Sequence, residues 1–144
     1  MSTPPMPPAP PVPPNNSFGP GQPLPMVTFA DAVKTCFSKY VDFTGRARRS
    51  EYWLFALFNF VVNIFVQIVD AAVGASNILV LIVGLGLFLP GLAVGIRRLH
   101  DTDRSGWFSL LALIPIVGTI VLLVFLCQDS KPGENRFGRS PKYV

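Results

Sequence analysis

The segment "WLFALFNFVVNIFVQIVDAAV", residues 53–73, decides the fold class of this 144-residue chain. Two more apolar blocks have a similar length: "ILVLIVGLGLFLPGLAVGI", residues 78–96, and "WFSLLALIPIVGTIVLLVFLC", residues 107–127. A helix of about 20 apolar residues is long enough to cross the hydrocarbon core of a bilayer. Asp70 is the only charged residue within the three blocks. We therefore expect an all-α membrane protein with three transmembrane helices.

The composition supports a membrane location. Half of the residues are hydrophobic and 14% are charged, whereas a soluble domain usually carries about a quarter charged residues. The net charge is +4, and the basic residues cluster beside the apolar blocks, so we expect membrane phospholipids rather than nucleic acid as partners. The two cysteines, Cys36 and Cys127, predict no disulfide framework. The chain start lacks the pattern of a cleaved signal peptide, so we expect the first membrane helix to direct insertion.

Residues 1–26 form a proline-rich tail with eleven prolines. The run "PPMPPAPPVPP", residues 4–14, repeats every three residues, which is the period of a polyproline II helix. The pattern fits either a docking segment for a polyproline-binding partner or a spacer. The composition favours a disordered tail, followed by one membrane domain over residues 27–144.

Residues 27–42 predict a short amphipathic helix, because apolar side chains recur at helical spacing. Thr28 or Asp31 is the expected N-terminal cap. This helix fits either the membrane surface or a position packed against the other helices.

A polar stripe runs along the first membrane helix. Asn59, Asn63, Gln67 and Asp70 are spaced four, four and three residues apart, so they share one face. Polar side chains are costly against lipid, which favours hydrogen bonding between helices. The alternative is a polar pathway in an oligomeric transporter or channel.

Glycine and proline residues mark the other two blocks. Gly91 and Gly95 form a G-x-x-x-G pattern, which permits close helix approach and predicts a surface for a homo-oligomer. Pro90 and Pro115 predict kinks.

The basic residues give a conflicting prediction of topology. Five precede the first block, none lies between the first two blocks, three follow the second and four follow the third. The positive-inside rule then places the N-terminus and the loop over residues 97–106 in the cytoplasm. Three full spans put the basic C-terminal tail outside. We favour three spans over the alternative, in which the third block is re-entrant.

The stretch "GIRRLHDTDRSGW", residues 95–107, concentrates charge between two apolar blocks. Together with "FTGRARRSEYW", residues 43–53, it forms two collars of arginines, acids and aromatic residues. If the second helix continues past Ile96, Arg97 or Arg98 is spaced to pair with Asp101, and the collars can also pair across helices. The candidate cluster, either a structural clamp or a site for lipid head groups or a membrane partner, consists of Arg46, Arg48, Arg49, Glu51, Trp53, Arg97, Arg98, His100, Asp101 and Trp107.

Metal binding and catalysis find little support in this stretch. The segment "DTDRSG", residues 101–106, resembles half of a calcium loop, but Ala112 occupies the position of the acidic twelfth ligand. The chain has one histidine, which argues against zinc. His100 and Asp101 are adjacent in sequence, and adjacent residues on a helix do not face each other. We expect no metal, no cofactor and no enzymatic activity.

Four ordered elements carry a family resemblance. They are "FTGRARRSEYW" (43–53), "RRLHD" with "SGW" (97–107), "IPIVG" (114–118) and "GENRFGRSP" (133–141). The chain resembles the DUF805 family of small bacterial inner-membrane proteins over about residues 29–141. The resemblance implies a multi-pass inner-membrane protein and supplies no catalytic residues. Tight turns at Gly133 and Gly138 predict that the C-terminal element folds back toward one of the collars.

Overall fold

The computed structural model describes residues 21–143 of the chain. Every regular element in this range is helical, with isolated β-bridges at Pro23–Tyr143 and Asn135–Gly138. The all-α prediction is confirmed. The predicted disorder and polyproline docking of the tail concern mainly residues 1–20, which lie outside the described residues.

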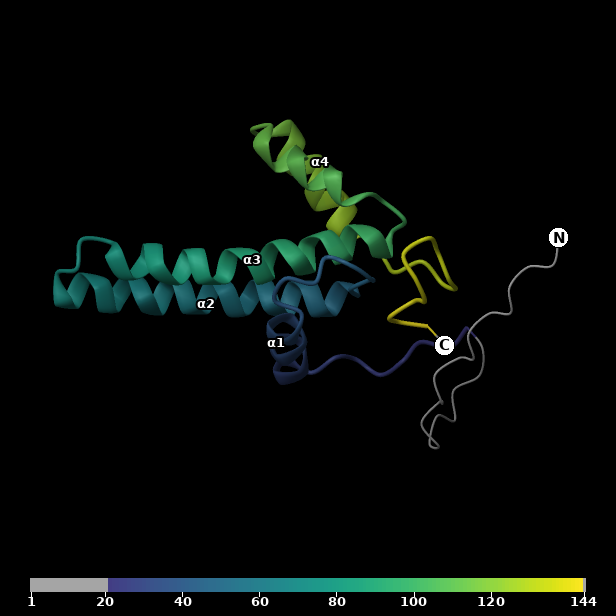
Figure 1. Ribbon diagram of the computed structural model, residues 1–144, viewed down its shortest axis with the longest axis horizontal. Coiled ribbons are helices and arrows are strands. Elements are labelled where there is room, and N and C mark those ends of the chain that lie inside the picture. The colour runs from purple at the N-terminus through teal and green to yellow at the C-terminus, as the bar shows by residue number, and fades with distance from the viewer. Residues whose placement is uncertain (1–20, 144) are drawn as a thin grey trace.

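Two long helices form the axis of the molecule. Helix α2 (Arg49–Val73) and helix α3 (Ile78–Asp101) lie side by side and antiparallel (Figure 1). Both are long and apolar enough to cross a membrane. Gly74, with φ of 68°, ends α2 in the left-handed conformation that favours glycine. Both helices extend beyond their apolar blocks, so the charged residues at their ends stand on rigid helix.

The third apolar block is not one helix. It folds into a 3₁₀ helix, η1 (Gly106–Leu113), and a short helix, α4 (Val117–Cys127). The chain reverses at Ile116, whose φ is +64°. Pro115 provides no N–H donor and disfavours helical geometry in the residue before it. The single kinked helix expected over residues 107–127 is therefore absent, and the count of three spans is not confirmed.

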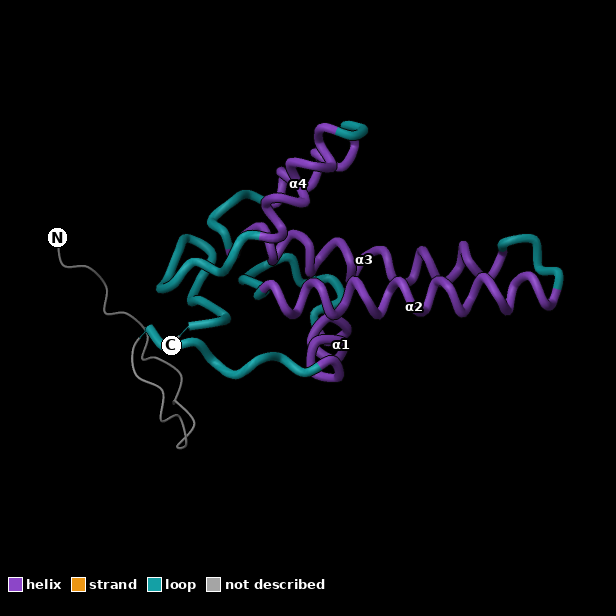
Figure 2. Tube along the Cα trace, turned by 180° about the vertical axis from the view of Figure 1, so that it is seen from behind, coloured by secondary structure: helices purple, strands orange, loops and turns teal. Residues whose placement is uncertain are grey.

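The reversal brings η1 and α4 together as a hairpin. Gly118 is required there, because a Cβ at this position would collide with the carbonyl oxygen of Leu111. At the open end, the rings of Phe108 and Phe125 are 5.8 Å apart. The hairpin therefore starts and finishes at the same end of the α2–α3 pair, and it diverges from that pair toward its tip (Figure 2).

Helix α1 (Phe29–Ser38) crosses α2 (Figure 1). Thr28 caps it, with its hydroxyl oxygen accepting a hydrogen bond from the backbone N–H of Asp31 at 3.2 Å. The Phe37 ring packs edge-on against Phe55 and Phe58, with centroids 5.9 and 5.8 Å away. Helix α1 therefore packs against the other helices, as one of the two expectations has it.

The glycine face of α3 is used within the chain. A Cβ at Gly91 would lie 3.9 Å from the side-chain nitrogen of Asn59, and one at Gly95 would lie 3.8 Å from the Tyr52 ring. The predicted close approach therefore occurs between α3 and α2. Helix α3 continues through Pro90 without a break.

Candidate functional site

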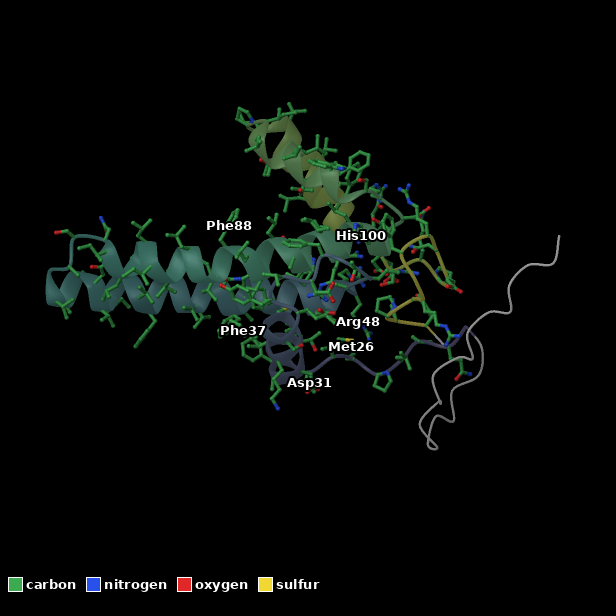
Figure 3. All side chains as sticks on the ribbon, in the orientation of Figure 1. Met26, Asp31, Phe37, Arg48, Phe88 and His100 are labelled. Atoms are coloured by element: carbon green, nitrogen blue, oxygen red, sulfur yellow. The ribbon has the colours of Figure 1, made fainter. Side chains whose placement is uncertain are left out.

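The charged ends of α2 and α3 meet the end of α4 and the C-terminal tail in one buried cluster. Figure 3 shows Arg48 and His100 at this end of the molecule. The polar and charged side chains buried here are Arg46, Arg48, Glu51, Arg97, Arg98, His100, Asp101, Thr102, Ser130 and Ser140.

Asp101 is the centre of one ion-pair network. Its side chain is fully buried. Arg46 Nη2 lies 2.9 Å from Oδ1, and Arg98 Nη1 lies 2.8 Å from Oδ2. The Ser130 hydroxyl donates to Oδ2 as well. The predicted Arg98–Asp101 pair is confirmed, and Arg46, in the segment before α2, is the second partner.

Arg97 and Glu51 form a second, separate pair. Arg97 Nη1 lies 2.8 Å from Glu51 Oε1, and the arginine side chain is fully buried. Its Nε and Nη2 atoms have no hydrogen-bond partner among the described residues. Asp101 is therefore not the partner of Arg97. Arg97 lies on the face of α3 that contacts α2, so its guanidinium meets Glu51 of α2 and not Asp101 of its own helix.

The Cys36 thiol lies next to this pair, 4.0 Å from Glu51 Oε1. Burial, and then the negative charge of Glu51, raise the pKa of Cys36 to about 12. The thiol is therefore held in its neutral form inside the contact of α1 with α2 and α3.

Arg46 also fastens the C-terminal tail. Its guanidinium donates to the backbone oxygens of Lys131 and Gly133, at 2.6 and 2.8 Å. The Asn135 side chain donates to the backbone oxygen of His100 at 2.9 Å. The predicted turn is present, since Asn135 and Gly138 exchange backbone hydrogen bonds. The tail therefore folds back onto the arginine cluster.

Arg48 and Arg49 differ from the paired arginines. Neither has a carboxylate within salt-bridge distance among the described residues. Arg48 Nη1 donates to the Pro25 backbone oxygen at 2.7 Å, and Arg49 is exposed. Both line a cavity of about 500 Å³, here called the basic groove. Its other lining residues are Met26, Ser50, Trp53, Leu54, Leu57, Asp129 and Lys142.

Lys142 and Asp129 close one side of the basic groove. Lys142 Nζ lies 2.6 Å from both carboxylate oxygens of Asp129. The hydrogen bond from Lys142 lowers the pKa of Asp129, and the same contact raises the pKa of Lys142. Arg49 contributes to the same lowering of the Asp129 pKa. With three basic residues and one carboxylate along its lining, the groove keeps a net positive charge.

The remaining cluster residues lie at the edges. His100 Nδ1 is 3.0 Å from the Gly45 carbonyl oxygen, and its ring stacks on Phe137. Trp53 and Trp107 are 39% and 78% exposed, as expected for aromatic anchors at a membrane interface. Trp107 stands outside the ion-pair cluster.

The polar stripe of α2 is divided among several local roles. Asn59 faces Gly91, and the Asn63 side chain donates to the backbone oxygen of Asn59 at 2.8 Å. Gln67 is exposed. Asp70 is buried, and its Oδ2 accepts a hydrogen bond from Val80 N at 3.2 Å, near the start of α3. The four residues share a helix face but not one environment.

Sequence reasoning missed several residues of the site. Ser130, Asp129 and Lys142 come from the tail, where turn signals indicated folding back but named no contact. Among the residues that the structure describes, no group of three or more His, Cys, Asp or Glu residues is placed to hold a metal ion.

Comparison with known proteins identifies the family. The model of the family described as "Protein of unknown function (DUF805)" matches residues 40–139. Inner membrane protein YhaH of Escherichia coli (strain K12) is 50% identical over 108 residues, which cover 72% of this chain and 89% of the relative. Inner membrane protein YhaI of the same strain is 48% identical over 105 residues, with the same coverage. No solved structure matches the chain.

These relatives and the apolar helices α2 and α3 agree on the cellular location. The inner-membrane location predicted from the sequence is confirmed. The chain belongs to the DUF805 family.

Proposed function

We propose that this protein is a non-enzymatic inner-membrane protein that binds the phosphate of anionic phospholipids in the basic groove. The observation that carries the proposal is the contrast among the arginines. Arg46, Arg97 and Arg98 each have a buried carboxylate partner. Arg48 and Arg49 have none within salt-bridge distance among the described residues, and the carboxylate that lines their cavity, Asp129, is paired with Lys142.

The groove suits a lipid head group. Arginine offers a planar set of donors that binds a phosphate through two hydrogen bonds. Trp53 stands one helical turn beyond Arg49, where an aromatic ring favours the membrane interface. Leu54 and Leu57 line the same groove and offer apolar contact to the glycerol region and the first methylenes of a lipid.

In this proposal the buried pairs are the scaffold of the site. Arg97, Arg98 and Asp101 are fully buried, so their charges act within the protein. They hold the start of α2 to the end of α3, which fixes the backbone that presents Arg48 and Arg49. His100 and Asp101 bond to different partners, Gly45 and the arginines, which argues against a catalytic dyad.

We also propose a topology of two spans, α2 and α3, with the η1–α4 hairpin as a re-entrant segment. Both ends of the hairpin lie beside the cluster, as Arg104 Nη1 is 2.7 Å from Gln128 Oε1. All twelve lysines and arginines then lie on one side of the membrane, as the positive-inside rule favours. The N-terminus and the C-terminal tail are both cytoplasmic in this proposal.

The test is the binding of phosphatidylglycerol to the purified protein, with the zwitterionic phosphatidylcholine as the reference. Arg48→Gln/Arg49→Gln is the test variant, and Lys34→Gln/Arg139→Gln is a control with the same charge change. We expect the preference for phosphatidylglycerol to fall about tenfold or more in the test variant alone, since one charge-assisted hydrogen bond contributes about 1.5–3 kcal/mol. Equal losses in both variants would contradict a defined site.

Arg49→Gln alone guards against misfolding of the double variant. Arg49 is exposed, so its replacement leaves the buried contacts of Arg48 in place. A partial loss of phosphatidylglycerol preference with an unchanged melting temperature supports the proposal. No loss contradicts a role for Arg49.

The transporter or channel alternative draws no comparable support. Asn63 donates to its own helix and Asp70 bonds to α3, which favours structural roles for these polar groups. Homo-oligomerisation and binding of another membrane protein remain proposals. The mass of the purified complex tests both.

A further inference from the structure

A second cavity, of about 640 Å³, separates α3 from η1. Phe88, Leu92, Ile96 and His100 line it along α3 at intervals of four residues, so they form one face of the helix. Figure 3 shows Phe88 and His100 on the side of α3 that faces the hairpin. The face extends for about 18 Å at the helical rise of about 1.5 Å per residue. We call this cavity the hairpin groove.

The hairpin groove is open to the outside of the molecule, because residues on both of its walls are exposed. Phe88 on one wall and Leu113 on the other are 62% and 79% exposed. In an inner-membrane protein, apolar side chains exposed along a spanning helix face lipid chains. The groove is therefore continuous with the bilayer.

One end of the hairpin groove is polar and rigid. The Gly45 carbonyl can only accept a hydrogen bond, so His100 Nδ1, 3.0 Å away, carries the proton. In the neutral ring, Nε2 is then an acceptor. The Phe137 ring stacks on the imidazole with centroids 3.9 Å apart and 2° between the planes, which fixes its orientation.

Gly106 keeps this acceptor open to the groove. A Cβ at Gly106 would lie 3.6 Å from His100 Nε2 and 2.7 Å from Ile96 Cγ2. Both Gly106 and His100 line the hairpin groove. A side chain at position 106 would occupy the space in front of Nε2.

We propose that the hairpin groove holds one acyl chain of a membrane phospholipid whose head group carries a primary ammonium, and that His100 Nε2 accepts a hydrogen bond from this donor. The length of the groove, its apolar walls and its polar end match an amphiphile. The site is independent of the basic groove, because it recognises a donor rather than a negative charge.

Two zwitterionic lipids test this proposal without changing net charge. Phosphatidylethanolamine has an ammonium donor, whereas phosphatidylcholine has none. Lipids with identical acyl chains are mixed with the purified full-length protein, and bound lipid is counted by native mass spectrometry. We expect one phosphatidylethanolamine to be retained about tenfold in preference to phosphatidylcholine, as one hydrogen bond to a charged group predicts.

Variants separate the chain site from the head-group contact. Leu92→Trp fills the groove from α3 and Ala112→Phe fills it from the hairpin, and each is expected to remove one bound lipid. Leu85→Trp, on an exposed position of α3 outside the groove, is the control and retains it. His100→Asn keeps a donor for the Gly45 carbonyl but removes Nε2, so the lipid stays while its ethanolamine preference disappears.

The proposal is overturned if both filled variants retain the full lipid count, or if His100→Asn retains the ethanolamine preference. It is also overturned if the groove holds a second copy of the protein in place of lipid, seen as a dimer that the filled variants dissociate. Arg48→Gln/Arg49→Gln serves as a cross-check, since it is expected to leave the ethanolamine preference unchanged. The basic-groove proposal is therefore tested by the preference for phosphatidylglycerol over phosphatidylcholine. The hairpin-groove proposal is tested separately, by the preference for phosphatidylethanolamine over phosphatidylcholine.

Discussion

Arg97 and Glu51 are 46 positions apart in the sequence, yet Nη1 of the arginine lies 2.8 Å from Oε1 of the glutamate. Glu51 stands in the first turn of α2 and Arg97 near the end of α3, so this pair joins the same end of both long helices. The arginine side chain is fully buried. Such a pair specifies the register of two apolar helices, whose remaining contacts are largely non-directional.

Replacement of Glu51 by Gln is expected to destabilise the protein strongly. The substitution leaves the Arg97 charge buried without a carboxylate, and breaking a buried pair in this way costs about 3–5 kcal/mol. Thermal unfolding in mild detergent measures the effect. Glu134→Gln, at an exposed position of the tail, is the control. Equal melting temperatures for the two variants are the result that excludes a stabilising pair.

The two cysteines are expected to differ in reactivity. The pKa of Cys36 is raised to about 12 by burial, and the thiolate is the reactive form, so only about one molecule in 10⁴ is reactive at pH 8. Cys127 is exposed. Iodoacetamide at pH 8 should therefore modify Cys127 alone in the folded protein and both cysteines in denaturant. Peptide mapping reads the sites, and rapid labelling of Cys36 in folded protein contradicts the packing of α1.

The contact between Asp129 and Lys142 predicts a loosening of the tail in acid. The pKa of Asp129 is lowered in the folded state, so its stabilisation is present above the ordinary carboxyl pKa of about 3.9 and is lost as pH falls through the folded value. The pKa of Lys142 is raised, so its stabilisation is lost only as pH rises above about 10.4. Stability from this pair is constant between about pH 5 and 9.

Trp53, which lines the basic groove with Lys142, reports this change in a Trp107→Phe background. Its emission is expected to shift as pH falls below about 3.9, and the step should vanish on Asp129→Asn. The pair is partly exposed, so its energetic effect is small. An acid step that persists in Asp129→Asn assigns the titration to another carboxyl group.

Asp70 and Gln67 are expected to respond in opposite ways to loss of polarity. Asp70 bonds to Val80 N at the start of α3, and loss of a side-chain cap costs about 0.5–2 kcal/mol. Gln67 is exposed on a membrane helix, so Gln67→Leu is neutral or stabilising. Unfolding of Asp70→Ala and Gln67→Leu tests both. Lost function in Gln67→Leu with normal folding and assembly instead favours the polar pathway.

The apolar blocks were sufficient to predict α2 and α3 because length and hydrophobicity are local properties. The block 107–127 has the length and hydrophobicity of a span as well, so the same criteria predict a kinked membrane helix there. Its reversal depends on the positive φ of Ile116 and on the close contact that Gly118 permits. Neither feature can be read from hydropathy.

The charged residues of the cluster were also predictable, but most of their partners were not. Helical spacing predicted the local pair Arg98–Asp101. The partners of Arg46 and Arg97 depend on how α2 turns against α3 and where the tail folds. Spacing within one segment carries no information about either, so the Glu51–Arg97 pair and the tail contacts required the structure.

Reporter fusions at Val144 show directly whether the apolar hairpin returns the chain to the cytoplasmic side. Alkaline phosphatase is active only outside the cytoplasm, and green fluorescent protein is fluorescent when fused on the cytoplasmic side. Phosphatase inserted after Gly74, between α2 and α3, is the positive control. We expect a silent phosphatase and a bright fluorescent fusion at Val144, with full-length protein in both. An active phosphatase at Val144 would contradict this topology and restore three full spans.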